Sequence, residues 1–168
     1  MDIAAEGLRR SKQVPEDDAR RALRVVRSQL PVSARDTHKI GVIGSSAGGH
    51  LMATLMAYND EGNAHATNTI EQQRSRPDFG VLVYPVISME DGLTYDPSKT
   101  NLFGHNLTSQ KRQRFVEYFS IEKHVNHLFP PVFMFHTKDD AVVSVENTYR
   151  MVDALEKAKV SKEQKGGL

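Results

Sequence analysis

Cysteine is absent from the 168 residues of this chain. Disulfide bonds, thiolate nucleophiles and cysteine-ligated metals are therefore excluded, and redox chemistry by the chain's own side chains is not expected. An excess of charge is also missing, because 22 Lys and Arg residues face 21 Asp and Glu residues. A net charge of +1 gives no general attraction to nucleic acid or to an acidic membrane, so neither is expected as a partner.

Long apolar runs are missing as well. No stretch approaches the ~18 apolar residues of a membrane span, and the N-terminal "MDIAAEGLRRSKQ" has no apolar signal-peptide core. We therefore expect a soluble chain without a signal peptide, cytoplasmic if its N-terminus is native. The length predicts a single domain, with flexible polar ends at residues 1–14 and 161–168.

Three short apolar segments alternate with segments of helical periodicity. Strands are predicted at residues 39–44, 79–85 and 131–136, and helices at about 16–30, 48–58, 109–118 and 145–159. This alternation predicts an α/β fold of three αβα layers around a parallel sheet. The segment "FGVLVYP" at 79–85 is apolar almost throughout, which predicts a strand buried on both faces.

The first predicted helix carries a row of arginines. We expect a solvated helix face, with phosphate binding as the alternative, for Arg20, Arg21, Arg24 and Arg27.

The strongest chemical signal is the stretch "GVIGSSAGGH" at 41–50. Within it, residues 44–48 fit the pattern G-x-S-x-G between a predicted strand and a predicted helix, which is the setting of a nucleophile elbow. Ser46 is then the nucleophile, and the backbone N–H of Ala47 is a donor to a developing oxyanion. The flanking glycines let strand and helix approach closely. A glycine-rich turn that serves only helix packing is the alternative, while the endings of known phosphate-binding loops are missing.

A serine nucleophile needs a base and an orienting carboxylate. The loop "HTKDDAVVSVEN" follows the third predicted strand, and we select Asp140 as the acid, with Asp139 as the fallback. Ligands of parallel sheets bind at the carboxyl ends of the strands, where Ser46 and Asp140 both fall. The alternative is an aspartate that caps the helix beginning near Val145.

The blocks "DDARRALRVVRSQL", "IGVIGSSAGGHLMATL", "RPDFGVLVYPVISM" and "PPVFMFHTKDDAVVSVENTYRMVDALEKAKV" resemble α/β-hydrolase esterases of the carbohydrate-esterase type, which includes bacterial acetyl xylan esterases. The similarity spans about residues 15–160. It implies a Ser, Asp, His triad in that order that hydrolyses small acyl esters, typically acetyl groups on carbohydrates, without a metal or organic cofactor. Ser46 matches the nucleophile of that family, and Asp140 matches the acid.

The departures from the family concern the base and the first strands. No histidine follows Asp140, and the tail "EQKGGL" resembles the family's K-G-G-H-G-x-G block broken off before its histidine. The family's upstream glycine-rich oxyanion loop has no counterpart, since only Gly7 precedes Gly41. The resemblance thus implies an incomplete α/β-hydrolase domain over residues 1–168, lacking the N-terminal strands and the last strand.

Two consequences of this incompleteness remain open. The base is a histidine from outside these residues or, as a substitute, His136, whereas His50 is expected to pack or cap. His124 and His127 lack a third metal ligand in view, so no metal site is expected.

The exposed edge of the strand before Ser46 predicts a homo-oligomer that covers it.

Two functions follow from the sequence. The first is a carboxylic ester hydrolase that acts on a small acyl ester or acetylated sugar through Ser46. The alternative is a catalytically incomplete family member that serves as a scaffold or interaction module without esterase activity.

Overall fold

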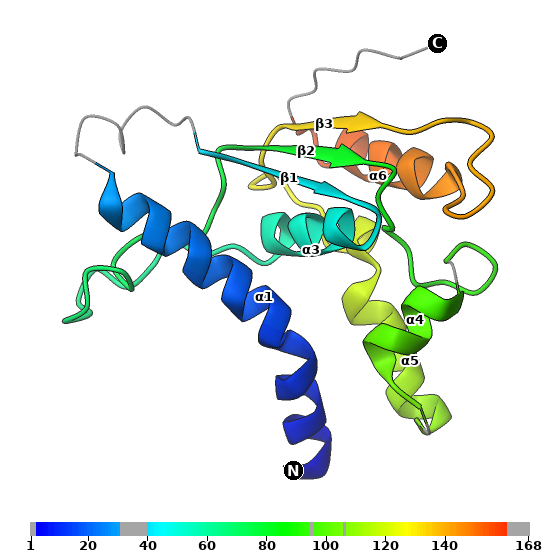
Figure 1. The fold of residues 1–168 in the computed structure, drawn as a ribbon, viewed down its shortest axis with the longest axis horizontal. Helices are drawn as coiled ribbons and strands as arrows, with labels where there is room; N and C mark the ends of the chain where they lie inside the picture. The colour runs from blue at the N-terminus through cyan, green and yellow to red at the C-terminus, as the bar shows by residue number, and fades with distance from the viewer. Residues whose placement is uncertain (1–2, 31–39, 95, 106, 161–168) are drawn as a thin grey trace.

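A computed structural model describes residues 3–30, 40–94, 96–105 and 107–160, with side chains from residue 14 onward. His38 and the predicted flexible end at 161–168 lie outside these residues. The elements follow in the order α1 (Ile3–Gln29), β1 (Gly41–Ser45), α3 (Ser46–Ala57), β2 (Phe79–Val83), α4 (Asp96–Phe103), α5 (Ser109–Phe119), the 3₁₀ helix η1 (Ile121–Lys123), β3 (Val132–Phe135) and α6 (Glu146–Lys157) (Figure 1).

The three strands form one parallel sheet in the order β1-β2-β3. Ser45 pairs with Val83, and Val83 with Phe135, so the strands end level with one another. The residues that follow the three strands therefore lie side by side at the carboxyl edge. This arrangement confirms the predicted parallel α/β fold and the predicted strands, to within two residues at their ends.

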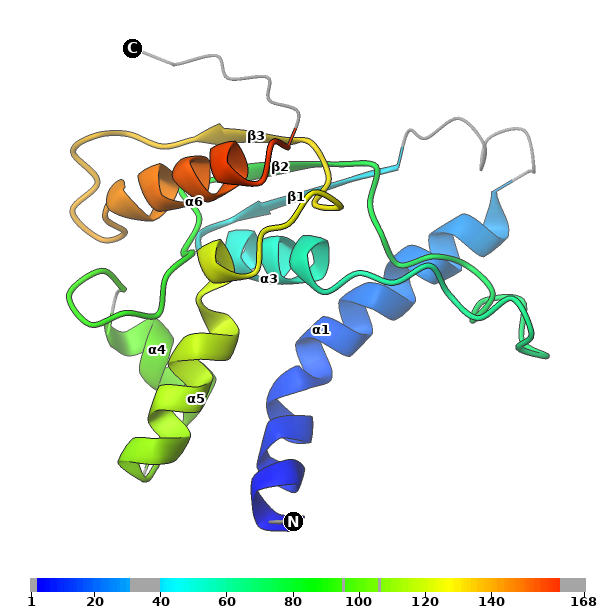
Figure 2. The same cartoon turned by 180° about the vertical axis from the view of Figure 1, so that it is seen from behind.

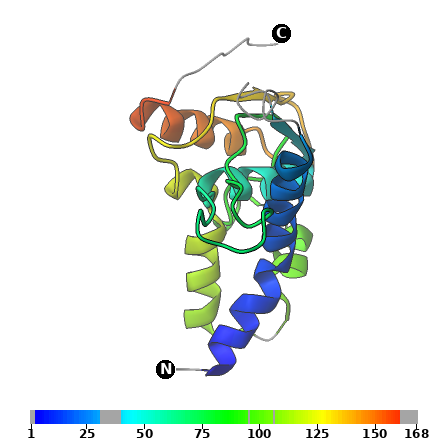
Figure 3. The ribbon, with the colours of Figure 1, turned by 90° about the vertical axis from the view of Figure 1, so that its left-hand side faces the viewer.

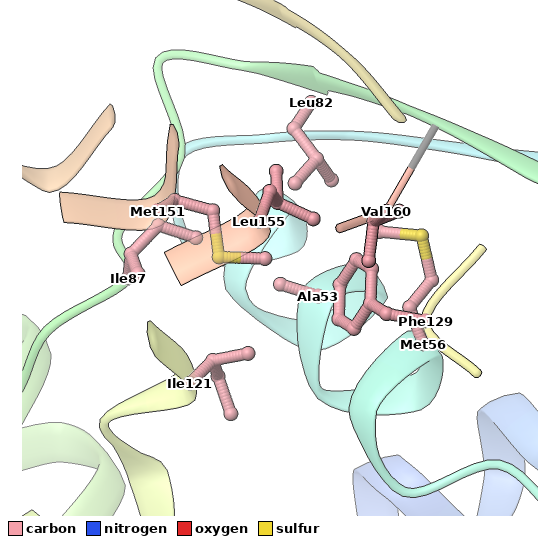
Figure 4. Close-up of a cluster of buried hydrophobic side chains, with 9 residues drawn as sticks. All are labelled: Ala53, Met56, Leu82, Ile87, Ile121, Phe129, Met151, Leu155 and Val160. Atoms are coloured by element: carbon pink, nitrogen blue, oxygen red, sulfur yellow. The ribbon is translucent and has the colours of Figure 1, made fainter. Parts of the chain in front are cut away.

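One face of the sheet is covered by α3 and α6, which lie on the same side of the strands in Figures 1 and 2. Leu82 of β2 is fully buried there between Ala53 and Met56 of α3 and Met151 and Leu155 of α6 (Figure 4). Apolar side chains buried in this way contribute ~1.5–3 kcal/mol each for the larger residues. This core fixes the direction in which α3 leaves the end of β1.

The opposite face of the sheet is open. Four large apolar residues on this face are exposed to solvent: Ile43 by 72 %, Phe79 and Phe135 by 44 %, and Phe133 by 38 %. The prediction that residues 79–85 are buried on both faces is therefore wrong for the part of the chain that the structure describes. Strand β2 is apolar on both faces, but among the described residues helices cover only the face that carries Leu82.

A second apolar cluster lies beyond the carboxyl edge, where α4 and α5 pack together. It consists of Val86, Met89, Phe103, Phe115, Val116, Phe119 and Val143. Helix α4 is not among the predicted helices, because the pair Asp96-Pro97 is also typical of a turn. Both residues suit the first turn of a helix, since proline needs no N–H partner there and an acidic side chain favours the helix dipole.

Helix α1 is longer than expected, because it begins at Ile3 and includes Pro15. Whether residues 1–14 are flexible stays a prediction. None of the helices in the described ranges has the length and apolar character required to cross a membrane.

Of the four arginines predicted to form a solvated face of α1, Arg21 is exposed and lies 3.1 Å from Glu71, whereas the other three are largely covered. Arg27 contacts Asp78 at 3.1 Å with both side chains buried, and Arg24 contacts Asp60 at 2.6 Å and Glu71 at 2.8 Å. Arg20 pairs with Glu16 on the same helix. The polar excursion at 59–78 lies beside α1 (Figure 3), so these charges hold the two segments together. Placement of the excursion is a tertiary feature that the helical pattern alone does not reveal.

Candidate active site

Ser46 stands at a strained turn between β1 and α3. Ser45 is extended, with φ −120° and ψ 148°, whereas Ser46 has φ 52° in the left-handed region and begins the helix. A residue other than glycine held in this region costs ~1–3 kcal/mol, which the surrounding packing must offset. The predicted strand–turn–helix geometry around Ser46 is thus present. The next residue, Ala47, lies in the first turn of α3, where backbone N–H groups have no partner within the helix.

The glycines of the turn have unequal roles. A Cβ on Gly44 would lie 2.3 Å from the carbonyl oxygen of Gly48, and a Cβ on Gly49 would lie 2.8 Å from Cβ of Pro85. A Cβ on Gly48 would meet nothing within 4 Å. Close approach of strand and helix therefore requires Gly44 and Gly49, whereas the second glycine of the G-x-S-x-G pattern is not sterically required.

Tyr84 is a second strained residue at the same edge. It follows β2 as Ser46 follows β1, and it has φ 38°. Its N–H donates to the carbonyl oxygen of Phe135 over 2.7 Å, and the N–H of Val86 donates to the carbonyl oxygen of Ser46 over 3.2 Å. The left-handed backbone of Tyr84 was not predicted from the sequence. The Tyr84-Pro85 pair signals a break in the strand, but it does not reveal the left-handed backbone.

Asp140 is held by its own loop. Its Oδ1 accepts hydrogen bonds from the N–H groups of Val142 and Val143, each over 2.9 Å. The bond from Val143, followed by that from Val142, lowers the pKa of the Asp140 carboxyl below its ordinary value. These bonds lie within the loop, and α6 has Val145 at its N-cap without a side-chain cap, so Asp140 does not cap α6. Asp139, the fallback acid, is exposed.

His136 directly follows β3, and its side chain is buried. Its Nδ1 lies 2.8 Å from Oγ1 of Thr148, and its Nε2 lies 2.8 Å from the carbonyl oxygen of Val143. Because a carbonyl only accepts, Nε2 must carry the proton, and Nδ1 then accepts from the Thr148 hydroxyl. Asp140 Oδ2 is 3.6 Å from Nε2. The His136 ring therefore links the acid loop, through Nε2, to helix α6, through Nδ1.

His50 lies one turn after Ser46 on α3 and is buried. Its Nδ1 is 3.2 Å from the carbonyl oxygen of Val86, while its buried Nε2 has no hydrogen-bond partner. Burial lowers the pKa of His50 to about 4. The ring thus anchors the segment whose N–H contacts Ser46, which confirms the expected packing role. Among the described residues, no cluster of three or more His, Asp or Glu side chains has the arrangement of a metal site.

A recess of about 410 Å³ adjoins the acid loop. Its lining consists of Gly92, Leu93, Thr94, Asp96, Pro97, Asp140, Ala141, Val142 and Ser144. A larger recess of about 610 Å³ lies between α6 and residues 122–127, and its lining contains none of the predicted site residues.

The unequal glycines yield a stability prediction. Gly49→Ala and Gly44→Ala should each lower the free energy of unfolding by ~1–3 kcal/mol, because the new methyl group overlaps neighbouring atoms. Gly48→Ala should raise it by ~0.5–1 kcal/mol, because alanine is the better helix former and has open space. Urea denaturation of the three variants checks the order. Equal losses for Gly48→Ala and Gly49→Ala would contradict the geometry.

The buried His50 predicts acid sensitivity. Its folded pKa of about 4 lies below the ordinary value of 6.5, so the unfolded chain binds the proton first as the pH falls. The contribution of His50 to stability is complete above pH ~6.5 and declines by ~3 kcal/mol on reaching pH ~4. His50→Gln does not titrate, so the difference in unfolding free energy between the two proteins should change over this range. A pH-independent difference would show that His50 does not carry the effect.

Comparisons with known proteins identify the family of this chain. The BD-FAE family model matches residues 11–155. The chain is similar to the crystal structure of an acetyl ester-xyloside bifunctional hydrolase from Caldicellulosiruptor lactoaceticus, with a TM-score of 0.79 and 37 % sequence identity. The matched region covers 88 % of this chain and 53 % of the hydrolase.

Two curated relatives are longer than this chain. Endo-1,4-beta-xylanase B of Butyrivibrio fibrisolvens is 34 % identical over 146 residues, which is 87 % of this chain and 22 % of the relative. An acetylxylan esterase of Xylanibacter ruminicola is 29 % identical over 135 residues, or 80 % of this chain and 25 % of the relative. The chain thus spans about a quarter or less of these relatives and about half of the related crystal structure.

The family match covers most of the chain, and the level strand ends, the left-handed Ser46 and the parallel sheet agree with the α/β-hydrolase fold. On this evidence the chain belongs to the BD-FAE family, and its fold is part of an α/β-hydrolase fold.

Proposed function

We propose that this chain contributes the nucleophile and the acid of a serine esterase that hydrolyses small acyl esters, and acetyl esters of carbohydrates in particular. The observation that carries the proposal is the left-handed backbone of Ser46 at the junction of β1 and α3. Backbone strain of this kind clusters at active sites, and here it coincides with the serine of the G-x-S-x-G pattern. The substrate class follows the similarity to proteins named acetylxylan esterase and acetyl ester-xyloside hydrolase.

In the proposed reaction, Ser46 Oγ attacks the ester carbonyl carbon and gives its proton to a base. The carbonyl oxygen becomes an oxyanion that accepts a hydrogen bond from the N–H of Ala47. The alcohol then leaves with the transferred proton, and water releases the acyl group from Ser46 by the same route. Asp140, whose pKa is lowered by the N–H groups of Val143 and Val142, remains ionised to orient the base.

We assign the base to a histidine from outside the described residues. His136 is the substitute proposed from the sequence, but its Nδ1 and Nε2 are engaged by Thr148 and Val143. To accept the proton of Ser46, its ring would have to give up one of these bonds. A serine esterase without its base retains only the catalysis that binding and the oxyanion hole supply, about 10³–10⁴ over water in a well-studied protease.

A test uses p-nitrophenyl acetate with and without added imidazole, which supplies an external base. Hydrolysis should fall to the solution rate in Ser46→Ala, and imidazole should accelerate the wild-type chain beyond its effect on Ser46→Ala. Asp140→Asn should reduce the imidazole-dependent part of the rate, because Asp140 acts by orienting the base, and its matched control Asp139→Asn, at an exposed side chain, should not. Peptide mass spectrometry should find the acetyl group on Ser46. Wild-type rates equal to those of Ser46→Ala under both conditions would refute an esterase role.

A second candidate function is an interaction module without esterase activity. The open sheet face favours it, because exposed apolar patches mark interaction surfaces. We infer that a second copy of the chain covers β1 and this face. This is the homo-oligomer that the sequence predicts from the exposed edge of the strand before Ser46. Ile43, at 72 % exposure on β1, is central to that surface.

Association should therefore depend on Ile43. Ile43→Lys places a charge on the open face and should shift sedimentation toward the monomer at concentrations where the wild-type chain associates. Val26→Lys is the matched control, because Val26 is also half exposed but belongs to α1. A wild-type chain that stays monomeric throughout the accessible concentration range would contradict the homo-oligomer.

A further inference from the structure

Val143 joins the predicted catalytic acid to the histidine at the end of β3. Its N–H donates to Oδ1 of Asp140 over 2.9 Å, and its carbonyl oxygen lies 2.8 Å from Nε2 of His136. Its side chain is buried, at 2 % exposure, in the second apolar cluster. The position of the Asp140 carboxyl therefore depends on a residue that His136 also binds.

Asp140 uses its two carboxyl oxygens differently. Oδ1 accepts both backbone bonds, from the N–H groups of Val142 and Val143, whereas Oδ2 accepts no hydrogen bond from the described residues. A carboxylate oxygen left open in this way is the acceptor that an incoming histidine base requires. The two bonds to Oδ1 therefore determine the orientation in which Oδ2 meets that base.

His136 is the group that could occupy this open oxygen. Its Nε2 lies 3.6 Å from Oδ2 of Asp140, which is too long for a hydrogen bond, and 2.8 Å from the carbonyl oxygen of Val143. The His136 side chain is only 1 % exposed, so its N–H needs an acceptor within the protein. The carbonyl of Val143 supplies that acceptor and thereby leaves Oδ2 open.

Thr148 determines which ring nitrogen carries the proton. It lies in the first turn of α6, and its Oγ1 is 2.8 Å from Nδ1 of His136. In a neutral ring one nitrogen donates and the other accepts, so a hydroxyl that donates to Nδ1 keeps the proton on Nε2. In the opposite tautomer, the lone pair of Nε2 would face the carbonyl oxygen of Val143, and the bond between them would be lost.

We propose that His136 is a positioning residue for Asp140, because its Nε2–H holds Val143, and that Thr148 keeps the proton on that nitrogen. The two side chains together keep Oδ1 of Asp140 bound to its loop and Oδ2 open to the base. The catalytic meaning of this arrangement rests on the proposed esterase function, whereas the contacts themselves can be measured without catalysis.

The experiment measures the pKa of the Asp140 carboxyl by carbon NMR and the protonation of the His136 ring by nitrogen NMR. At a pH where the ring is neutral, the wild-type chain should show a protonated Nε2 and a bare Nδ1. His136→Phe keeps a ring but has no N–H, so it should raise the pKa of Asp140 toward its ordinary value as the bond from Val143 loosens.

Thr148→Val removes the hydroxyl with little change in shape, and it decides the test if His136→Phe does not fold. The opposite tautomer of His136 should appear, and the pKa of Asp140 should rise. Imidazole-dependent hydrolysis of p-nitrophenyl acetate should fall about three- to tenfold, which corresponds to one neutral hydrogen bond. Thr148→Ser restores the hydroxyl and should reverse all three changes.

Thr54→Val is the matched control. Thr54 is also a helical threonine, but it lies on α3, and its hydroxyl donates to the carbonyl oxygen of His50 over 2.8 Å. This variant should leave the His136 tautomer and the pKa of Asp140 unchanged, and thermal melting checks that each variant is folded. A wild-type ring protonated on Nδ1, an Asp140 pKa that Thr148→Val leaves unchanged, or an equal response to Thr54→Val would overturn the proposal.

The positioning role and the esterase function fail separately. An Asp140 pKa that responds to Thr148→Val, in a chain whose hydrolysis is unaffected by Ser46→Ala, keeps the positioning contacts and refutes the esterase function. Hydrolysis that depends on Ser46, with an Asp140 pKa that does not respond to Thr148→Val, refutes the positioning role alone.

Discussion

The carboxyl edge of the sheet depends on the parallel pairing of Ser45 with Val83 and of Val83 with Phe135. Because these residues are level, the chain leaves the three strands at neighbouring points and delivers Ser46, Tyr84 and His136 side by side. The N–H of Val86 then reaches the carbonyl oxygen of Ser46, and that of Tyr84 reaches Phe135. A slip of one residue in either pairing would turn every side chain of a strand to the other face and separate these groups.

Around this edge, buried polar side chains hold the loops that follow the strands, and two of them, His50 and Asn147, reach segments 36 and 54 residues away. His50 contacts the carbonyl of Val86, His136 spans Thr148 and Val143, and Asn147 spans Leu93 and Ser144. Each is a side chain on or beside a helix that packs against the sheet. The loops at the edge are therefore positioned by the same helices that build the core, which explains how irregular segments keep a defined geometry.

Much of the edge was predictable from sequence, because local patterns determine it. The pattern around Ser46 predicted a strand, a turn and a helix, and the structure has all three. Features that depend on tertiary contacts were not predictable. The partners of Arg24 and Arg27 come from residues 60–78, and Asn147 of α6 binds the carbonyl oxygens of both Leu93 and Ser144 beside Asp140. The left-handed Tyr84 and the helix at Asp96 had local signals, in Tyr84-Pro85 and Asp96-Pro97, that admit more than one conformation.

The open sheet face has a thermodynamic consequence. Ile43, Phe79 and Phe135 are already in contact with water in the folded chain, so unfolding adds less new apolar hydration than a fully covered sheet of this length would. The heat-capacity change of unfolding and the denaturant m-value scale with newly exposed area, and both are therefore reduced for the chain on its own. Any polypeptide that covers this face stabilises the fold by mass action, so the melting temperature becomes dependent on concentration.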